Sequence, residues 1–260
     1  MHHHRLAAAQ ATLAASGRAD SCVVIRWPVQ RTARIDRPHR SPLLACVYLH
    51  RLDWAWRHGE DGVLVRYADD LVVMCRTRGQ AEHALARLTW LLASLGLEPK
   101  PAKTAIVHLT EGGEGFDFLR FHHRLVRARG RQGTRRVVFL ARWPSRKAAQ
   151  HARDRVRELT DRSRLLVPVD QVMREVNAFL RGWAGYFRYG NSTRASDKIR
   201  ASALGRLSLF VAKRHKRSRA WDWRLVVYDV PRQLGLISFN GTVAAPRPNR
   251  PWRAPAEQRR

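Results

Sequence analysis

Hydrophobic and polar positions repeat with clear periods along most of the chain, and these periods predict its elements. Apolar, β-branched runs and alternating positions predict strands at 63–67, 70–75, 104–109, 115–122 and 137–143. Helical spacing of apolar residues predicts helices at 41–53, 79–95, 145–161, 169–189 and 196–214. Strands and helices mix up to about Trp143 and helices follow, so the pattern predicts an α+β chain with a helical second part.

The two ends of the chain carry less of this patterning. Alanine-rich residues 6–15 predict a weak helix and residues 22–27 a short strand, but we expect 1–41 to be divergent or poorly ordered, without a core of its own. Arginine and proline accumulate near the other end, which predicts a basic, disordered tail over 231–260.

Two helices have informative apolar faces. Ser41 is placed to cap the first, and its spacing puts the apolar residues Leu44, Val47, Tyr48 and Leu52 on one face. In the helix over 169–189, aromatic residues recur at helical spacing, which is typical of a core, and we assign Trp183 and Phe187 to it.

The net charge limits the candidate functions more than the rest of the composition does. Lysine and arginine total 49 against 21 acids, a formal charge of +28, which predicts salt-sensitive binding to a polyanion, most simply a nucleic acid. No apolar run approaches a membrane span, and we find no secretory signal peptide. Three separated cysteines form neither a disulfide framework nor a zinc motif, which fits a reducing cytoplasm.

The strongest candidate for chemistry is the stretch Val63–Cys75. Two apolar runs flank Tyr67-Ala68-Asp69-Asp70 and predict a β-hairpin with two carboxylates at its tip. Adjacent carboxylates repel each other, and a Mg²⁺ ion between them relieves the repulsion, as in two-metal phosphoryl or nucleotidyl transfer. The alternative is a solvated turn, because aspartate is a common turn residue.

Basic residues outside the hairpin form candidate nucleic-acid contacts. One set lies in an expected hairpin loop without acids, and its members are Arg127, Arg129, Arg131, Arg135 and Arg136. The second set lies on the predicted helices and comprises Arg181, Arg188, Asn191, Lys213, Arg214, Lys216 and Arg217. A solvated surface is the alternative for both sets. His122 and His123 are expected to face opposite ways on a strand, as polar surface rather than a metal pair.

Several of these motifs resemble those of bacterial group II intron-encoded reverse transcriptases. The helix from Ser41 and the hairpin with Tyr67–Asp70 are similar to the end of that family's palm. Lys103-Thr104 resembles its Pro-x-Lys-Thr element, and residues 118–121 resemble its Phe-Leu-Gly-Phe turn, with Arg120 where glycine is usual. Independently, Leu180–Asn191 resembles the thumb, or maturase, domain.

The resemblance implies a function and a division of the chain. The family copies intron RNA into DNA and helps that RNA to fold and splice. It implies a partial palm over 42–143 (an antiparallel hairpin sheet with packed helices) and a helical thumb/maturase bundle over 144–230. Asp69 and Asp70 would hold up to two Mg²⁺ ions. The implied nucleotide and primer contacts are Tyr67, Ala68, Lys103, Phe118, Leu119 and Arg120. The implied partners are group II intron RNA and a DNA primer or target, in a bacterial cytoplasm near the nucleoid.

The family draws a third carboxylate from an earlier palm strand. Asp20 and Asp36 are the only acids before Ser41, and neither has that sequence context, so we expect an N-terminally truncated copy. Three interpretations stay open. They are a polymerase, alone or completed by a separate N-terminal fragment or a homodimer; an inactive RNA-binding maturase remnant; and a degenerate reading frame. An unrelated nucleotidyltransferase with the same hairpin is disfavoured, because it would give no reason for the maturase-like segment.

Overall fold

The computed structural model describes residues 22–28, 41–68, 70–98, 104–129, 136–216 and 236–244. The chain divides into two units. The first contains residues 1–119, 123–141 and 248–260, and the second contains residues 120–122 and 142–247. The mixed α+β character predicted from the sequence is confirmed, with strands concentrated in the first unit and helices in the second.

The first unit is built on a four-stranded sheet. Its strands are β1 (Cys22–Pro28), β2 (Val63–Tyr67), β3 (Asp70–Cys75) and β4 (Ala105–Leu109), in the order β2-β3-β1-β4. Strand β1 pairs antiparallel with both β3 and β4. The predicted short strand over 22–27 is confirmed as β1, so the expectation that residues 1–41 are divergent or poorly ordered is wrong for 22–28, which form an interior strand of the sheet.

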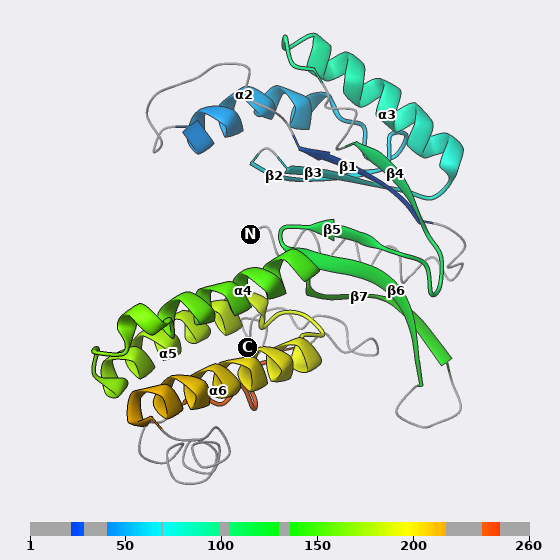
Figure 1. Ribbon diagram of the computed structural model, residues 1–260. Helices are drawn as coiled ribbons and strands as arrows, with labels where there is room; N and C mark the ends of the chain where they lie inside the picture. The colour runs from blue at the N-terminus through cyan, green and yellow to red at the C-terminus, as the bar shows by residue number, and fades with distance from the viewer. Residues whose placement is uncertain are drawn as a thin grey trace, which may run out of the picture. The chain divides into compact units, whose positions relative to one another are not determined.

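Two helices, α2 (Ser41–Ala55) and α3 (Arg78–Ala93), cover one face of this sheet (Figure 1). Thr77 caps α3 by accepting a hydrogen bond from the backbone N–H of Gln80. Helix α2 differs from its prediction. Leu52 is buried as expected, but Val47 and Tyr48 are 67% and 51% exposed.

The buried face of α2 is formed instead by Leu49 and Leu52, and Trp56, directly after the helix, continues this face. These residues also have helical spacing, so the sequence of α2 offers two apolar faces. The face that begins at Leu49 is the buried one, because it contacts α3 and β3. The Tyr48 hydroxyl donates to the backbone carbonyl of Leu95, which gives this exposed ring a polar partner.

The opposite face of the sheet packs against a three-stranded sheet of β5 (Phe116–Phe118), β6 (Phe121–Arg129) and β7 (Arg136–Pro144), in that order. Strand β3 is consequently buried on both sides. Leu71 and Val73 face the helices, whereas Val72 and Met74 belong to the core shared with Phe118. This double burial explains why residues 71–75 form an unbroken apolar run.

The second unit is a helical bundle of α4 (Arg146–Leu159), α5 (Val169–Phe187) and α6 (Thr193–His215), with a short 3₁₀ helix, η2 (Arg162–Arg164), after α4. Ser145 caps α4 by accepting a hydrogen bond from the backbone N–H of Ala148 at 3.2 Å. Trp183 and Phe187 are 7% and 3% exposed, which confirms their assignment to the core.

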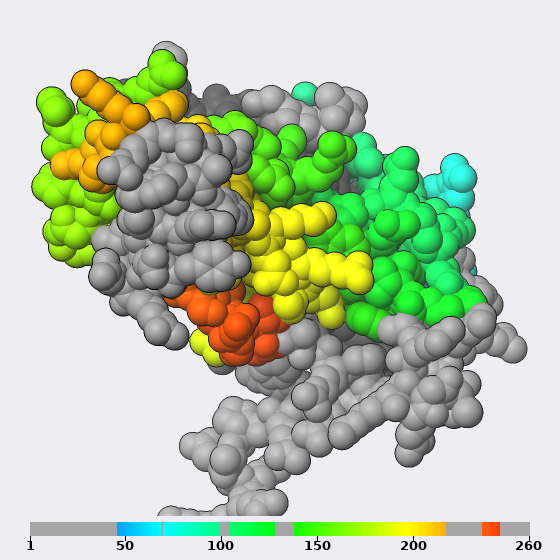
Figure 2. Space-filling model, turned by 60° about the horizontal axis from the view of Figure 1, so that its bottom comes forward, coloured from blue at the N-terminus to red at the C-terminus, as the bar shows by residue number. Residues whose placement is uncertain are grey.

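Residues 236–244 pack on this bundle. Leu236 and Phe239 are buried in its core, and the backbone N–H of Ile237 donates to the buried Asn177 Oδ1 at 2.9 Å. Figure 2 shows the segment, in orange-red, against the yellow residues of the α5–α6 region. The predicted disordered tail over 231–260 is therefore wrong for 236–244. Two apolar anchors hold this part in place, whereas 245–260 lie outside the described residues.

Candidate metal and nucleic-acid sites

The predicted hairpin is present as β2 and β3. Tyr67 pairs directly with Asp70, so residues 68 and 69 form the connection between the strands. Ala68 has φ +52°, a left-handed conformation that costs a residue with a Cβ about 1–2 kcal/mol. Tyr67 is 50% exposed and Asp70 half-buried at the first position of β3, whereas Asp69 lies outside the described residues.

The position of Asp70 in β3 places it on one face of the sheet. Side chains alternate along a strand, so Asp70 shares its face with Val72 and Met74, away from α2 and α3. Val72 and Met74 lie in one apolar cluster with Phe118 and Leu119. The structure thus brings the hairpin and the Phe118–Leu119 segment, two predicted site elements, onto one common core.

The register of β1 decides which residues neighbour Asp70. Pro28 is the direct partner of Asp70, and Arg26 is the partner of Val72. Strand β1 reads Cys-Val-Val-Ile-Arg-Trp-Pro and contains no acid. Within the described part of the chain, no three His, Cys, Asp or Glu side chains come together as a metal site.

The predicted strand over 115–122 is interrupted by a tight turn. Strand β5 ends at Phe118 and β6 begins at Phe121, so Leu119 and Arg120 form a two-residue connection. Their φ angles are +48° and +64°, as the type I′ turns favoured by two-residue hairpins require. Glycine fits such a position without strain, which explains physically why it is usual where Arg120 stands.

The same segment buries a histidine that the sequence assigned to polar surface. His123 is 3% exposed and stacks on Phe116 with ring centroids 4.9 Å apart. A Cβ at Gly115, which has φ +75°, would lie 2.1 Å from the backbone carbonyl oxygen of His123. The expectation for His123 is therefore wrong, because the absence of a side chain at Gly115 allows the strands to close over it. His122 is half-buried beside Trp143.

The arginine-rich loop can be described only in part. Arg127 is exposed on β6 and forms an ion pair with Glu111, so an acid outside the loop partly neutralises it. Arg129 and Arg136 are strand residues whose side chains are not described. Arg131, Arg135 and the predicted nucleotide contact Lys103 lie outside the described residues.

A buried arginine links β7 to the end of α5. Arg142 is 7% exposed, and its Nε donates to the backbone carbonyl of Tyr189 at 2.7 Å. Burial lowers the pKa of the Arg142 guanidinium from its ordinary value. Its backbone also exchanges two hydrogen bonds with Asn191, one from the Asn191 N–H at 2.6 Å and one to Asn191 Oδ1 at 3.3 Å.

Asn191 therefore has a structural role that the motif did not reveal, and its predicted RNA contact stays a prediction. Gly190 is required by the same junction. A Cβ there would lie 2.7 Å from the backbone carbonyl oxygen of Arg142 and 3.1 Å from the ring of Phe121. The Tyr-Gly-Asn sequence thus fixes the end of α5 against β7.

The remaining predicted RNA contacts lie on the surface of the helical unit. Arg181, Arg188, Lys213, Arg214 and Lys216 are exposed, and Arg217 lies outside the described residues. Arg188 lies over the ring of Tyr189 at 5.1 Å, and Arg214 donates to the backbone carbonyl of Leu165 at 3.0 Å. Exposure leaves these cations available to phosphates, and their binding to RNA stays a prediction.

Comparison with known families found two matches along the chain. The family model described as reverse transcriptase (RNA-dependent DNA polymerase) matches residues 39–143. The model described as group II intron, maturase-specific domain, matches residues 149–228. A comparison with curated proteins found no match.

The two matches are consecutive, and they fall on the sheet-containing part and on the helical part respectively. Together they identify a protein of the RNA-directed DNA polymerase/maturase family. The chain belongs to the family of group II intron-encoded reverse transcriptases and maturases, as its motifs predicted. Proteins of this family bind intron RNA and generally use Mg²⁺ for catalysis. No helix in the described ranges is long and apolar enough to cross a bilayer.

Proposed function

We propose that this chain binds group II intron RNA through its helical unit and contributes the carboxylates of its hairpin to Mg²⁺-dependent DNA synthesis on an RNA template. The observation that carries the proposal is the β2–β3 hairpin. It holds Asp70 at the start of a strand that is buried on both sides, next to a two-residue connection. A rigid strand fixes a carboxylate more precisely than a loop does.

The donor chemistry fits magnesium. A carboxylate at a half-buried strand end offers hard oxygen ligands and remains accessible to a phosphate. Asp70 would hold the ion together with its neighbour Asp69. When bound, Mg²⁺ would lower the pKa of the primer hydroxyl and neutralise the triphosphate. Tyr67, beside this position at the end of β2, is exposed and would contact the nucleotide or primer.

Two carboxylates do not complete a two-metal site. Since β1 offers no acid beside Asp70, we propose that a further carboxylate comes from a separate N-terminal reverse transcriptase fragment or from a second copy of the chain. Complementation with such a fragment is the corresponding test. Added fragment should raise extension by wild-type chain and leave Asp70→Asn inactive.

The RNA-binding half of the proposal is tested by charge reversal. Arg181→Glu with Arg188→Glu should weaken binding of intron RNA and lower the slope of log K against log salt by about 1 for each phosphate that no longer meets a cation. Arg174→Glu is a control on α5, the helix that carries Arg181 and ends just before Arg188, because Arg174 already pairs with Asp170 at 2.8 Å. Equal effects of both changes would contradict a defined RNA surface at Arg181 and Arg188.

A second candidate is an RNA-binding maturase without polymerase activity. It is favoured by one observation, that strand β1, which pairs with β3 beside Asp70, contains no acid that could complete a metal site. This candidate predicts that Asp69→Asn and Asp70→Asn leave the binding and splicing of intron RNA unchanged.

A further inference from the structure

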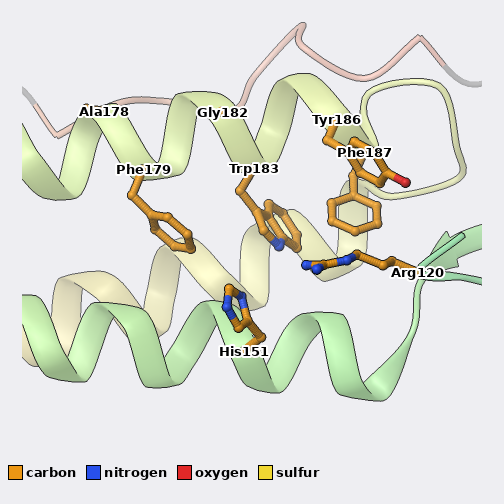
Figure 3. A pocket seen from close by; sticks show the side chains of 8 residues that line it. All are labelled: Arg120, His151, Ala178, Phe179, Gly182, Trp183, Tyr186 and Phe187. Carbon is orange, nitrogen blue, oxygen red and sulfur yellow. The ribbon is translucent and has the colours of Figure 1, made fainter. Parts of the chain in front are cut away.

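A pocket opens on the helical unit between α4 and α5, with Arg120 at its edge. Its volume is about 410 Å³, near the lower end of the range typical of small-molecule sites. Figure 3 shows that aromatic rings of α5 form one wall and that α4 forms the other. The side chains that carry its chemistry are Arg120, His151, Phe179, Trp183, Tyr186 and Phe187.

Trp183 supplies an unused hydrogen-bond donor to this pocket. The side chain is 7% exposed, and its Nε1 is buried without a hydrogen-bond partner among the described residues. In Figure 3 this nitrogen points into the space between His151 and Arg120. A buried N–H without a partner is unfavourable, so an acceptor that enters the pocket would satisfy a group that the protein leaves open.

Gly182 has no side chain and so leaves open space at the α5 wall of the pocket. Glycine inside a helix is less favourable than alanine, so it needs a reason such as close packing. Packing gives none here, because a Cβ at Gly182 would meet no atom within 4 Å. The same is true of Gly185, but only Gly182 lines the pocket. The space beside Gly182 is therefore left for something other than this chain.

The charge of the pocket selects an anionic ligand. Arg120 is exposed at its edge, and none of the described residues that line it carries a carboxylate. The backbone of Arg120 is fixed by the β5–β6 turn, and its carbonyl accepts a hydrogen bond from the Ser145 N–H at 2.8 Å. Flat aromatic rings, one buried donor and one guanidinium match a base with its attached phosphate.

We propose that this pocket binds a single unpaired nucleobase of RNA. Trp183 Nε1–H donates to a carbonyl of the base, the exposed ring of Tyr186 offers a stacking surface, and Arg120 contacts the adjacent phosphate. The inference rests on the proposed binding of intron RNA and adds to it a preference for bases outside a duplex.

The test compares two labelled RNAs by fluorescence anisotropy, a stem–loop with a uridine loop and the same stem as a closed duplex. Gly182→Ala should weaken stem–loop binding about tenfold, by filling the space beside the base, yet raise the melting temperature of the free chain. Gly185→Ala is the matched control and should raise the melting temperature without loss of affinity. Trp183→Phe should also weaken stem–loop binding, and duplex affinity should not change in any variant.

The outcomes separate this inference from the proposed function. A 4-thiouridine in the loop should crosslink to the α5 segment 178–187 in wild-type chain and not in Gly182→Ala. Unchanged stem–loop affinity in Gly182→Ala, or crosslinks that map elsewhere, would overturn the pocket assignment and leave RNA binding intact. Failure to bind the stem–loop would overturn this inference, and failure to bind group II intron RNA as well would overturn the proposed function with it.

Discussion

The turn at Leu119–Arg120 allows a quantitative test of the backbone. Arg120 has φ +64°, where a residue with a Cβ loses about 1–2 kcal/mol relative to glycine. Glycine also stabilises the unfolded chain by about 0.4–1 kcal/mol, because it allows that chain more conformations, and this reduces the advantage of glycine in the folded turn. Arg120→Gly should therefore be about 0.5–1 kcal/mol more stable than Arg120→Ala. Both variants lack the arginine side chain, so the comparison isolates the backbone.

Arg127 provides the matched control. It is exposed on strand β6, which begins directly after the turn, it lies outside the positive-φ residues, and both of its variants lose the same ion pair with Glu111. In extended structure glycine is less favourable, and Arg127→Gly should be about 0.5–1 kcal/mol less stable than Arg127→Ala. The sign of the glycine–alanine difference should thus reverse between the two positions.

Urea unfolding followed by far-ultraviolet circular dichroism measures both differences. A chain of this size should show a melting shift of about 2–4 °C for each kcal/mol, so differential scanning fluorimetry can confirm the order of the variants. If Arg120→Gly proved no more stable than Arg120→Ala while the Arg127 pair behaved as stated, the left-handed turn would be refuted.

Three further changes follow from the structure. Gly190→Ala should lower the melting temperature strongly, because the new methyl group would lie 2.7 Å from a carbonyl oxygen of β7; an unchanged melting curve would argue against that contact. The hydrogen bond from Arg164 at 2.7 Å lowers the pKa of Glu175. The ionised carboxylate therefore stabilises the fold at pH values above its ordinary pKa of about 4.3. This stabilisation is lost as the pH falls through the lowered pKa. Glu175→Gln should therefore flatten the loss of stability below pH 4, and an unaltered acid limb would exclude this role. Pro28→Asp adds a carboxylate opposite Asp70 and should make the melting temperature rise with Mg²⁺ more than in wild type; the same Mg²⁺ response in both would contradict the β1 register.

Local pattern predicted most elements of this chain but few of their long-range partners. The hairpin at 63–75 and the helix around Trp183 carry their period within one stretch of sequence, so they were predicted correctly. Strand β1 was underestimated because six apolar or basic residues do not reveal that they lie between β3 and β4. Its place depends on pairing with residues that follow it by about fifty and eighty positions.

Turns and anchors were harder to predict for a different reason. A two-residue hairpin preserves the alternation of apolar side chains, so residues 115–122 look like one strand although Leu119 and Arg120 reverse the chain. The one local signal, glycine, is missing at Arg120. Leu236 and Phe239 belong to a short apolar run, Leu234–Phe239, that is too short to show a helix or strand period, yet both are buried in the helical core.

In the candidate site, too, features set by local sequence were predicted and features set by long-range contacts were not. Residue types and spacing predicted the carboxylates and the exposed cations, but not the buried Arg142 or the unpaired Trp183 nitrogen, because burial and hydrogen bonding depend on elements far apart in sequence. Gly182, a glycine inside the helical pattern of α5, was the one signal in the sequence for the pocket.

Mg²⁺-dependent primer extension on an RNA template, with wild-type chain and Asp70→Asn compared after circular dichroism shows that both are folded, tests the central claim most directly. We expect extension by wild type, in the presence of the partner that supplies the missing carboxylate, and its loss in Asp70→Asn with intron RNA binding unchanged. No extension by a folded, RNA-binding wild-type chain, alone or with that partner, would contradict the polymerase role of the hairpin.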